Sequence, residues 1–132
     1  MKGNRLAVAF DFDGVVHDLF DGWRDGTIYG SPNEDVIDAM KELVKMKVPV
    51  FIFSTRSPFQ IEEWFNRKDF GMKSKVIPSD VFFFNDLDYI GVTNKKLPAS
   101  LYIDDRAVTY KGQDKKEILL LAIGKENEKS VQ

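Results

Sequence analysis

The chain has 132 residues, of which 43% are hydrophobic and 30% are charged, and its formal net charge is −2. These values are typical of one globular domain with a single core, and the lack of a positive excess argues against a protein built to bind nucleic acid. Because the sequence contains no cysteine, disulfides, thiolate zinc sites and a cysteine nucleophile are excluded.

The first predicted element is a strand buried on both faces, because residues 6–10 form an unbroken apolar run. Asp11, Asp13 and Gly14 follow it directly. In open α/β sheets the ligand crevice lies beyond the carboxyl ends of the strands, so acids here indicate a site that a hard cation such as Mg²⁺ would neutralise. The alternative is an ordinary Asp-rich turn in which Gly14 supplies a positive φ.

Residues 14–30 contain scattered glycines, acids and aromatics without a sustained period. We expect an ordered loop or a small hairpin over the site, because long irregular segments in compact domains are often lids or binding loops. The alternative is a surface loop whose aromatics pack on the body. If the segment is a lid, Trp23, Arg24 and Tyr29 are the residues expected to select the substrate.

The next predicted helix begins with a capping box at residues 31–34, has Pro32 at its first position and continues at helical spacing to Val44. An apolar run at residues 48–53 predicts a second buried strand. Strand, helix and strand then form a right-handed parallel unit.

Ser54, Thr55 and Arg56 follow the second strand, and another capping box at residues 57–60 opens a second helix. A hydroxyl, backbone N–H groups and a helix N-terminus converge there, which is a geometry that binds an anion. The alternative is that these residues are only caps and turn formers. The helix closes near Gly71, and its predicted buried face consists of Ile61, Trp64 and Phe65.

Further along, residues 81–84 are consistent with a strand or a packed loop, and residues 89–93 with a strand. Lys95 and Lys96 come next, before a short apolar strand at residues 101–103. This strand ends in a second acid cluster, which repeats the pattern at the end of the first strand. The cluster and the residue after it are Asp104, Asp105 and Arg106.

The C-terminal part predicts a short strand near residues 108–110, a third capping box at 114–117 and a helix at 118–123. This helix is apolar nearly all round, so it is either deeply buried or part of a contact with another subunit in a homo-oligomer. Residues 1–124 are expected to form one domain, and the polar residues 125–132 a frayed tail. The N-terminal apolar segment is too short for a signal peptide or a membrane span, so a cytoplasmic protein is expected by default.

The predicted strand ends deliver, in chain order, two aspartates, a serine, a lysine and two more aspartates. Phosphoryl transfer needs such a set, because acids hold a divalent cation while a hydroxyl and a lysine hold the phosphoryl group. Response-regulator receivers combine similar residues, but their lysine comes last, so the order here argues against a receiver.

The strings FDFDGVV, VFIFST, a lysine and LYIDDRA resemble the four motifs of the haloacid-dehalogenase-like hydrolases over residues 6–110. The resemblance implies an α/β, Rossmann-like three-layer fold with a mostly parallel central sheet, a flap at residues 14–30 and no large cap domain. It also implies a Mg²⁺-dependent phosphatase that hydrolyses a phosphomonoester through an aspartyl-phosphate. Such an open site suits a bulky substrate or closure by a neighbouring subunit.

The resemblance assigns roles residue by residue. Asp11 would be the nucleophile and Asp13 the general acid/base. Ser54 would hydrogen-bond the phosphoryl oxygens, with Thr55 and Arg56 as substrate-binding neighbours.

The lysine and the metal ligands each leave a choice open. Lys96 would pair with the phosphate, but Lys95 remains a fallback because the proline in KLPASLYIDD stands one place later than in the family pattern. Mg²⁺ would be held by the Asp11 carboxylate, the Asp13 backbone carbonyl and Asp105, with Asp104 adjacent or as the direct ligand.

Three further residues and the function itself have alternatives. Arg56 and Arg106 either contact substrate or form internal salt bridges, and His17 either touches substrate or packs in the flap. The competing function is a non-catalytic phosphate- or metal-binding module of the same fold. Among enzymes, a nucleotide or polynucleotide-end phosphatase is the alternative, although an acidic chain is less suited to long nucleic acids.

Overall fold

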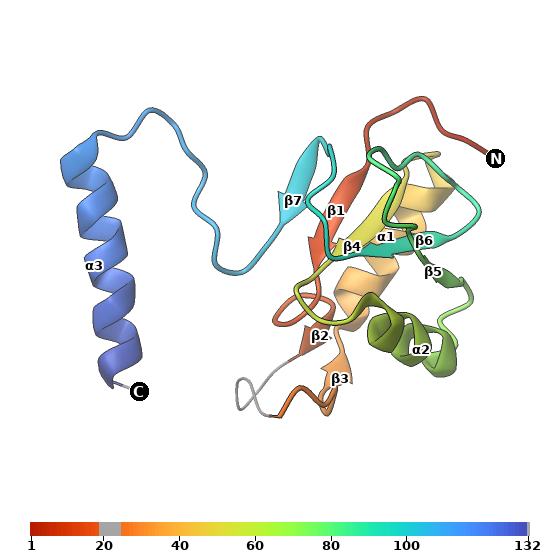
Figure 1. Cartoon of the computed structure of the whole chain (residues 1–132), viewed down its shortest axis with the longest axis horizontal. Helices are drawn as coiled ribbons and strands as arrows, with labels where there is room; N and C mark the ends of the chain where they lie inside the picture. Colours follow the sequence, from red (N-terminus) through yellow and green to blue (C-terminus); the bar gives the residue numbers. More distant parts are fainter. Residues whose placement is uncertain (19–24, 132) are drawn as a thin grey trace.

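The part of the chain that the structure describes is built on a five-stranded parallel sheet (Figure 1). The computed structural model describes residues 1–18 and 25–131, with the backbone alone from residue 125 on. The order across the sheet is β5-β6-β4-β1-β7, so the expected α/β, Rossmann-like fold is confirmed. The strands are β1 (Val8–Asp11), β4 (Val50–Phe53), β5 (Ser74–Val76), β6 (Ile90–Thr93) and β7 (Leu101–Ile103).

Two helices, α1 (Glu34–Lys45) and α2 (Pro58–Lys68), pack on one face of this sheet. Met40 of α1 is fully buried in the same apolar cluster as Phe10 of β1. The buried face predicted for α2 is confirmed, because its core side chains are Ile61, Trp64 and Phe65.

The start of α1 differs from the prediction. Its N-cap is Asn33, whose side-chain oxygen accepts a hydrogen bond from the Val36 N–H at 3.4 Å. The prediction of Pro32 at the first helical position is wrong, because residues 31 and 32 form β3 (Ser31–Pro32). This strand pairs antiparallel with β2 (His17–Asp18), so the segment after β1 contains a small hairpin, one of the two forms expected from the sequence.

The ends of α2 agree with the prediction in part. Ser57 is the N-cap and Pro58 the first helical residue, but the Ser57 side chain makes no capping hydrogen bond. The helix ends at Lys68, and its C-cap Asp69, two residues before Gly71, adopts the left-handed conformation with φ 58°. A residue other than glycine therefore carries the positive φ at this C-terminus.

Irregular segments rather than helices cover the opposite face of the sheet. Ala9 and Phe51 of the sheet pack there against Ile77, Phe84 and Leu97. Residues 81–84 are therefore a packed loop, one of the two alternatives. β5 escaped prediction because it is three residues long and has no apolar run.

The last helix, α3 (Lys115–Val131), stands apart from the sheet at the end of an extended segment, residues 104–114 (Figure 1). Asp114 accepts a hydrogen bond from the Glu117 N–H at 3.0 Å, which confirms the Asp114 half of the third capping box. Residues 108–110 form no strand, and their prediction is wrong because none of the described strands pairs with them. Among the described residues, no helix has the length and apolar character needed to cross a membrane.

Candidate functional site

Neighbouring strand ends bring three carboxylates together. β1 ends at Asp11, and the adjacent β7 leads directly into Asp104 and Asp105. One ligand oxygen from each of the three lies within 4.8 Å of the others. Carboxylate oxygens are the ligands that Mg²⁺ prefers, so the donor set fits a hard divalent cation.

Gly14 makes room for one of these acids. Its φ is +86°, and a Cβ at this position would lie 2.2 Å from Oδ2 of Asp105. No other residue satisfies both conditions, because a side chain would be strained by the backbone and would collide with the carboxylate. Gly14 is therefore both the turn residue expected from the sequence and a contact of the acid cluster.

The electrostatics of the cluster favour a bound cation. The pKa of Asp11 is raised from 3.8 to about 6, mainly because burial disfavours the charged carboxylate and then because of the negative charge of Asp104. Asp105 and Asp13 raise it further, while the Phe12 backbone N–H opposes the shift. A divalent cation would offset this repulsion, so the residues present fit Mg²⁺.

A cavity of about 530 Å³ opens beside the acids. Ser54 follows β4, the neighbour of β1, and its hydroxyl oxygen accepts a hydrogen bond from the Arg56 N–H at 3.2 Å. The hydroxyl proton remains available as a donor toward an anion in the cavity. The lining residues are Asp11, Asp13, Phe53, Ser54, Thr55, Asp104, Arg106 and Ala107.

Both oxygens of the Asp13 carboxylate already have partners. Oδ1 lies 2.9 Å from Nδ1 of His17, and Oδ2 accepts a hydrogen bond of 2.7 Å from Nε of Arg56. The Arg56 guanidinium is buried and also donates to the Gly26 carbonyl. Asp13 is thus fixed between the segment after β1 and the loop after β4.

The second nitrogen of His17 defines which tautomer is present. Nε2 accepts a hydrogen bond of 2.7 Å from the Gly30 N–H, so the single ring proton of the neutral imidazole is on Nδ1 and is donated to Asp13. The ring is fully buried and stacks on Phe12 at 5.3 Å. His17 is therefore a packing residue of the flap, which was one of the two alternatives.

Arg56 and Arg106 were each expected either to contact substrate or to form an internal salt bridge, and the structure places them differently. Arg56 holds Asp13 and the flap, so the structure gives it the internal salt bridge rather than a place on the cavity wall. Arg106 lines the cavity, and its Nε lies 3.9 Å from Oδ1 of Asp105. Both side chains are exposed at that contact, so the pair contributes little to stability.

Neither candidate lysine lines the acid cavity. The Lys95 ammonium donates to the Ser79 carbonyl and lies 4.6 Å from the Phe82 ring, beside a different cavity. The Lys96 ammonium lies 5.3 Å from the Tyr102 ring, and Tyr102 packs against Phe53 of the cavity wall.

Sequence reasoning missed the hydrogen-bonded chain from Gly30 through His17 and Asp13 to Arg56. No signal in the sequence marks it, because Arg56 is 43 residues from Asp13 and reaches it only in the folded sheet. Among the predicted selectivity residues, Tyr29 packs edge-on against His17 at 5.9 Å. Trp23 and Arg24 lie outside the described residues.

Comparisons with known proteins support the fold. No protein-family model and no curated protein matches the chain. The chain is similar to a solved structure described as that of a conserved protein from Bacteroides thetaiotaomicron, with 23% identity, 93% of each chain covered and a TM-score of 0.52. At this level of identity the likeness shows the fold alone, and that fold is α/β with a parallel central sheet.

Proposed function

We propose that the chain is a capless haloacid-dehalogenase-like phosphatase that hydrolyses a phosphomonoester with Mg²⁺. The observation that carries the proposal is the meeting of Asp11, Asp104 and Asp105 beside a cavity that also contains Ser54. These residues come from three neighbouring strand ends, in the chain order of the family motifs. An acid cluster alone is common, but one that adjoins a hydroxyl at a parallel strand end has the acids and the hydroxyl that phosphoryl transfer needs.

Asp11 is the proposed nucleophile. An oxygen of its carboxylate attacks phosphorus, the bond to the leaving-group oxygen breaks, and an aspartyl-phosphate forms. Water then attacks the same phosphorus, which releases inorganic phosphate and restores the carboxylate. Ser54 orients the phosphoryl group by donating its hydroxyl proton to a phosphoryl oxygen.

Asp13 is the proposed general acid and base. Its carboxyl gives a proton to the leaving oxygen in the first step and takes one from water in the second. Each Asp13 oxygen accepts one hydrogen bond in the structure and has a second lone-pair site, so the carboxyl can carry this proton and keep both partners. His17 and Arg56 keep the side chain aligned between the steps.

The residues that would hold Mg²⁺ are Asp11, Asp104 and Asp105, with the Asp13 backbone carbonyl as the further ligand that the family resemblance implies. When bound, the ion would neutralise negative charge on the carboxylates and on the phosphoryl oxygens. The chain's own contribution is the placement of Asp11 in the lining of the cavity, where its carboxylate can face phosphorus.

The direct test is hydrolysis of an aryl phosphate with Mg²⁺ and with EDTA. Asp11→Asn is expected to lower turnover by at least about 10³-fold, because it removes the nucleophile. Asp38→Asn, an exposed acid on α1, is the matched control and should leave turnover unchanged. Turnover that persists in Asp11→Asn or in EDTA would contradict the proposal.

A non-catalytic cation-binding module is the second candidate. It is favoured by one observation, that neither Lys95 nor Lys96 lines the cavity of the acids. Mg²⁺ binding measured by calorimetry, together with no hydrolysis across a panel of phosphorylated metabolites, would select this candidate over the enzyme.

A further inference from the structure

We propose that two copies of this chain form a dimer by exchanging α3, so that α3 of each copy lies in an apolar groove between α1 and β7 of the other. The inference is independent of the proposed phosphatase activity. It rests on two exposed apolar surfaces in one molecule and on the charges at their borders.

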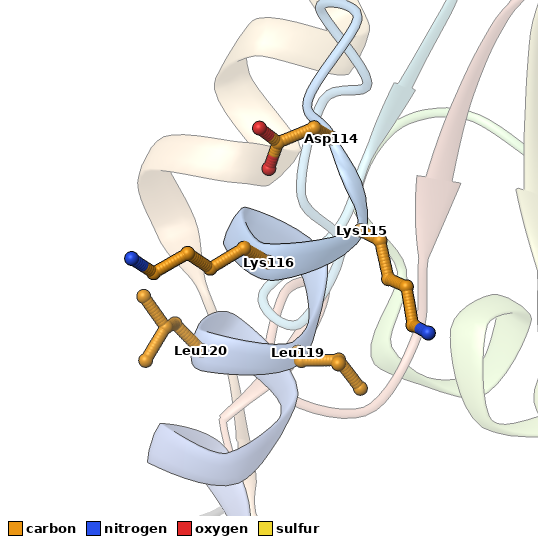
Figure 2. Close-up of a pocket in the computed structure, with 5 residues that line it drawn as sticks. All are labelled: Asp114, Lys115, Lys116, Leu119 and Leu120. Carbon is orange, nitrogen blue, oxygen red and sulfur yellow. The ribbon is translucent and has the colours of Figure 1, made fainter.

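The first surface is α3 itself. The large aliphatic side chains of its first half are each about half exposed, and Leu120 is 62% exposed. They follow one another along the chain, so they surround the helix. Figure 2 shows Lys116 and Leu120 extending to one side of α3 and Lys115 and Leu119 to the other. A helix that is apolar all round is stable in water only when other elements cover it.

The second surface is a groove of about 630 Å³ on the α1 side of the sheet. Its floor is formed by β1 and the edge strand β7, and its wall by α1. Leu101 of β7 is 53% exposed there, although its strand pairs directly with the buried strand β1. The apolar side chains of the groove are Val8, Phe10, Val36, Ala39, Leu43, Leu101 and Ile103.

The two surfaces are complementary in charge. Asp35 and Glu42 of α1 stand at the rim of the groove, whereas Lys115 and Lys116 open α3. A helix that enters the groove by its N-terminal half places these lysines near the acidic rim. Opposite charges at the border of an apolar contact determine how the helix is oriented in the groove more than how tightly it binds.

The position of α3 selects a second copy as the occupant. Residues 104–114 lead away from β7 as an irregular segment, and α3 lies apart from its own groove (Figure 1). Two identical arms and two identical grooves close into a symmetric pair in which each groove is filled and the side of α3 that faces it is covered. The exchange would also fix Arg106 and Ala107, which begin this segment and line the acid cavity.

Light scattering on the purified full chain tests the stoichiometry. The expected mass is twice that of the chain, and Leu120→Asp is expected to raise the dimer dissociation constant at least about 100-fold, since charge replaces a central apolar anchor. Ala39→Arg, which places a cation in the groove, should act in the same direction. Phe82→Asp, at an exposed aromatic on the other face of the sheet, should leave the dimer intact.

Cross-linking tests the exchange itself. Because the chain has no cysteine, Ala39→Cys and Leu120→Cys can be made as separate copies, mixed and joined with a short bismaleimide. A cross-linked mixed dimer is expected. Three results would overturn the proposal. They are a monomeric protein, a variant with both cysteines in one chain that cross-links only within that chain, and a monomer that binds lipid vesicles through α3.

Discussion

Replacing Asp11 by asparagine should stabilise the metal-free protein at neutral pH. Asp11 has a folded pKa of about 6 against an ordinary value of 3.8, so the folded state binds its proton more tightly than the unfolded state. The carboxyl therefore lowers the free energy of unfolding progressively as pH rises from 3.8 to about 6, and the loss is complete above that window. An asparagine side chain at this position would carry no charge and cause no such loss.

The magnitude follows from the size of the shift. Two pKa units correspond to about 3 kcal/mol, and solvent screening of this partly exposed carboxyl reduces the expected effect to roughly 1–2 kcal/mol. For a domain of this length, that gain raises Tm by roughly 4–8 °C.

The assay is thermal unfolding in EDTA at about pH 8 and at about pH 3, on either side of the titration window. Asp11→Asn should exceed the natural sequence in Tm at the higher pH and approach it at the lower pH. Mg²⁺ should raise the Tm of the natural sequence and have a smaller effect on Asp11→Asn, because binding to the folded state alone stabilises it. Equal Tm values at the higher pH, or equal Mg²⁺ shifts, would refute the reasoning.

The remaining predictions concern residues around the acids. Gly14→Ala should cost roughly 1–3 kcal/mol of stability and weaken Mg²⁺ binding measured by calorimetry, because the new Cβ strains a backbone at φ +86° and displaces Asp105; undisturbed binding would show that the contact is unimportant. His17→Phe should cost roughly 2–4 kcal/mol in urea unfolding, since it removes a hydrogen-bond partner from both Asp13 and the Gly30 N–H; a neutral change would contradict the assigned hydrogen bonds. The family resemblance assigns Lys96 to the phosphate, so Lys96→Met should lower aryl phosphate turnover by at least about tenfold while Lys95→Met should not; the reverse order would make Lys95 the phosphate-binding lysine.

The sequence predicts where Asp11 and Ser54 lie because the end of a strand can be recognised from the residues immediately around it. Apolar runs identify β1 and β4, and a parallel sheet puts their carboxyl ends at one edge, so Asp11 and Ser54 could be brought together from pattern alone. The same reasoning misplaced the start of α1. Both Ser31 and Asn33 are residue types that favour the N-cap position. Because Pro32 pairs with His17 in the hairpin, residues 31 and 32 are in a strand, and Asn33 is the N-cap.

The environment of Asp13 could not be predicted in this way. Its partners come from His17, at the start of the hairpin, and from Arg56 in the loop after another strand. Which of several nearby cations and donors reaches a carboxylate depends on side-chain packing in the folded state, and a local motif does not encode it. The same limit applies to Lys96, whose distance from the acids depends on the course of the loop between β6 and β7.

Mass spectrometry of the protein quenched in acid during turnover of a phosphomonoester tests the central claim most directly. We predict one phosphoryl group on the peptide that contains Asp11, present with Mg²⁺ and absent in Asp11→Asn. Continued release of inorganic phosphate with the phosphoryl group on another residue, or on none, would contradict the assignment of Asp11 as the nucleophile.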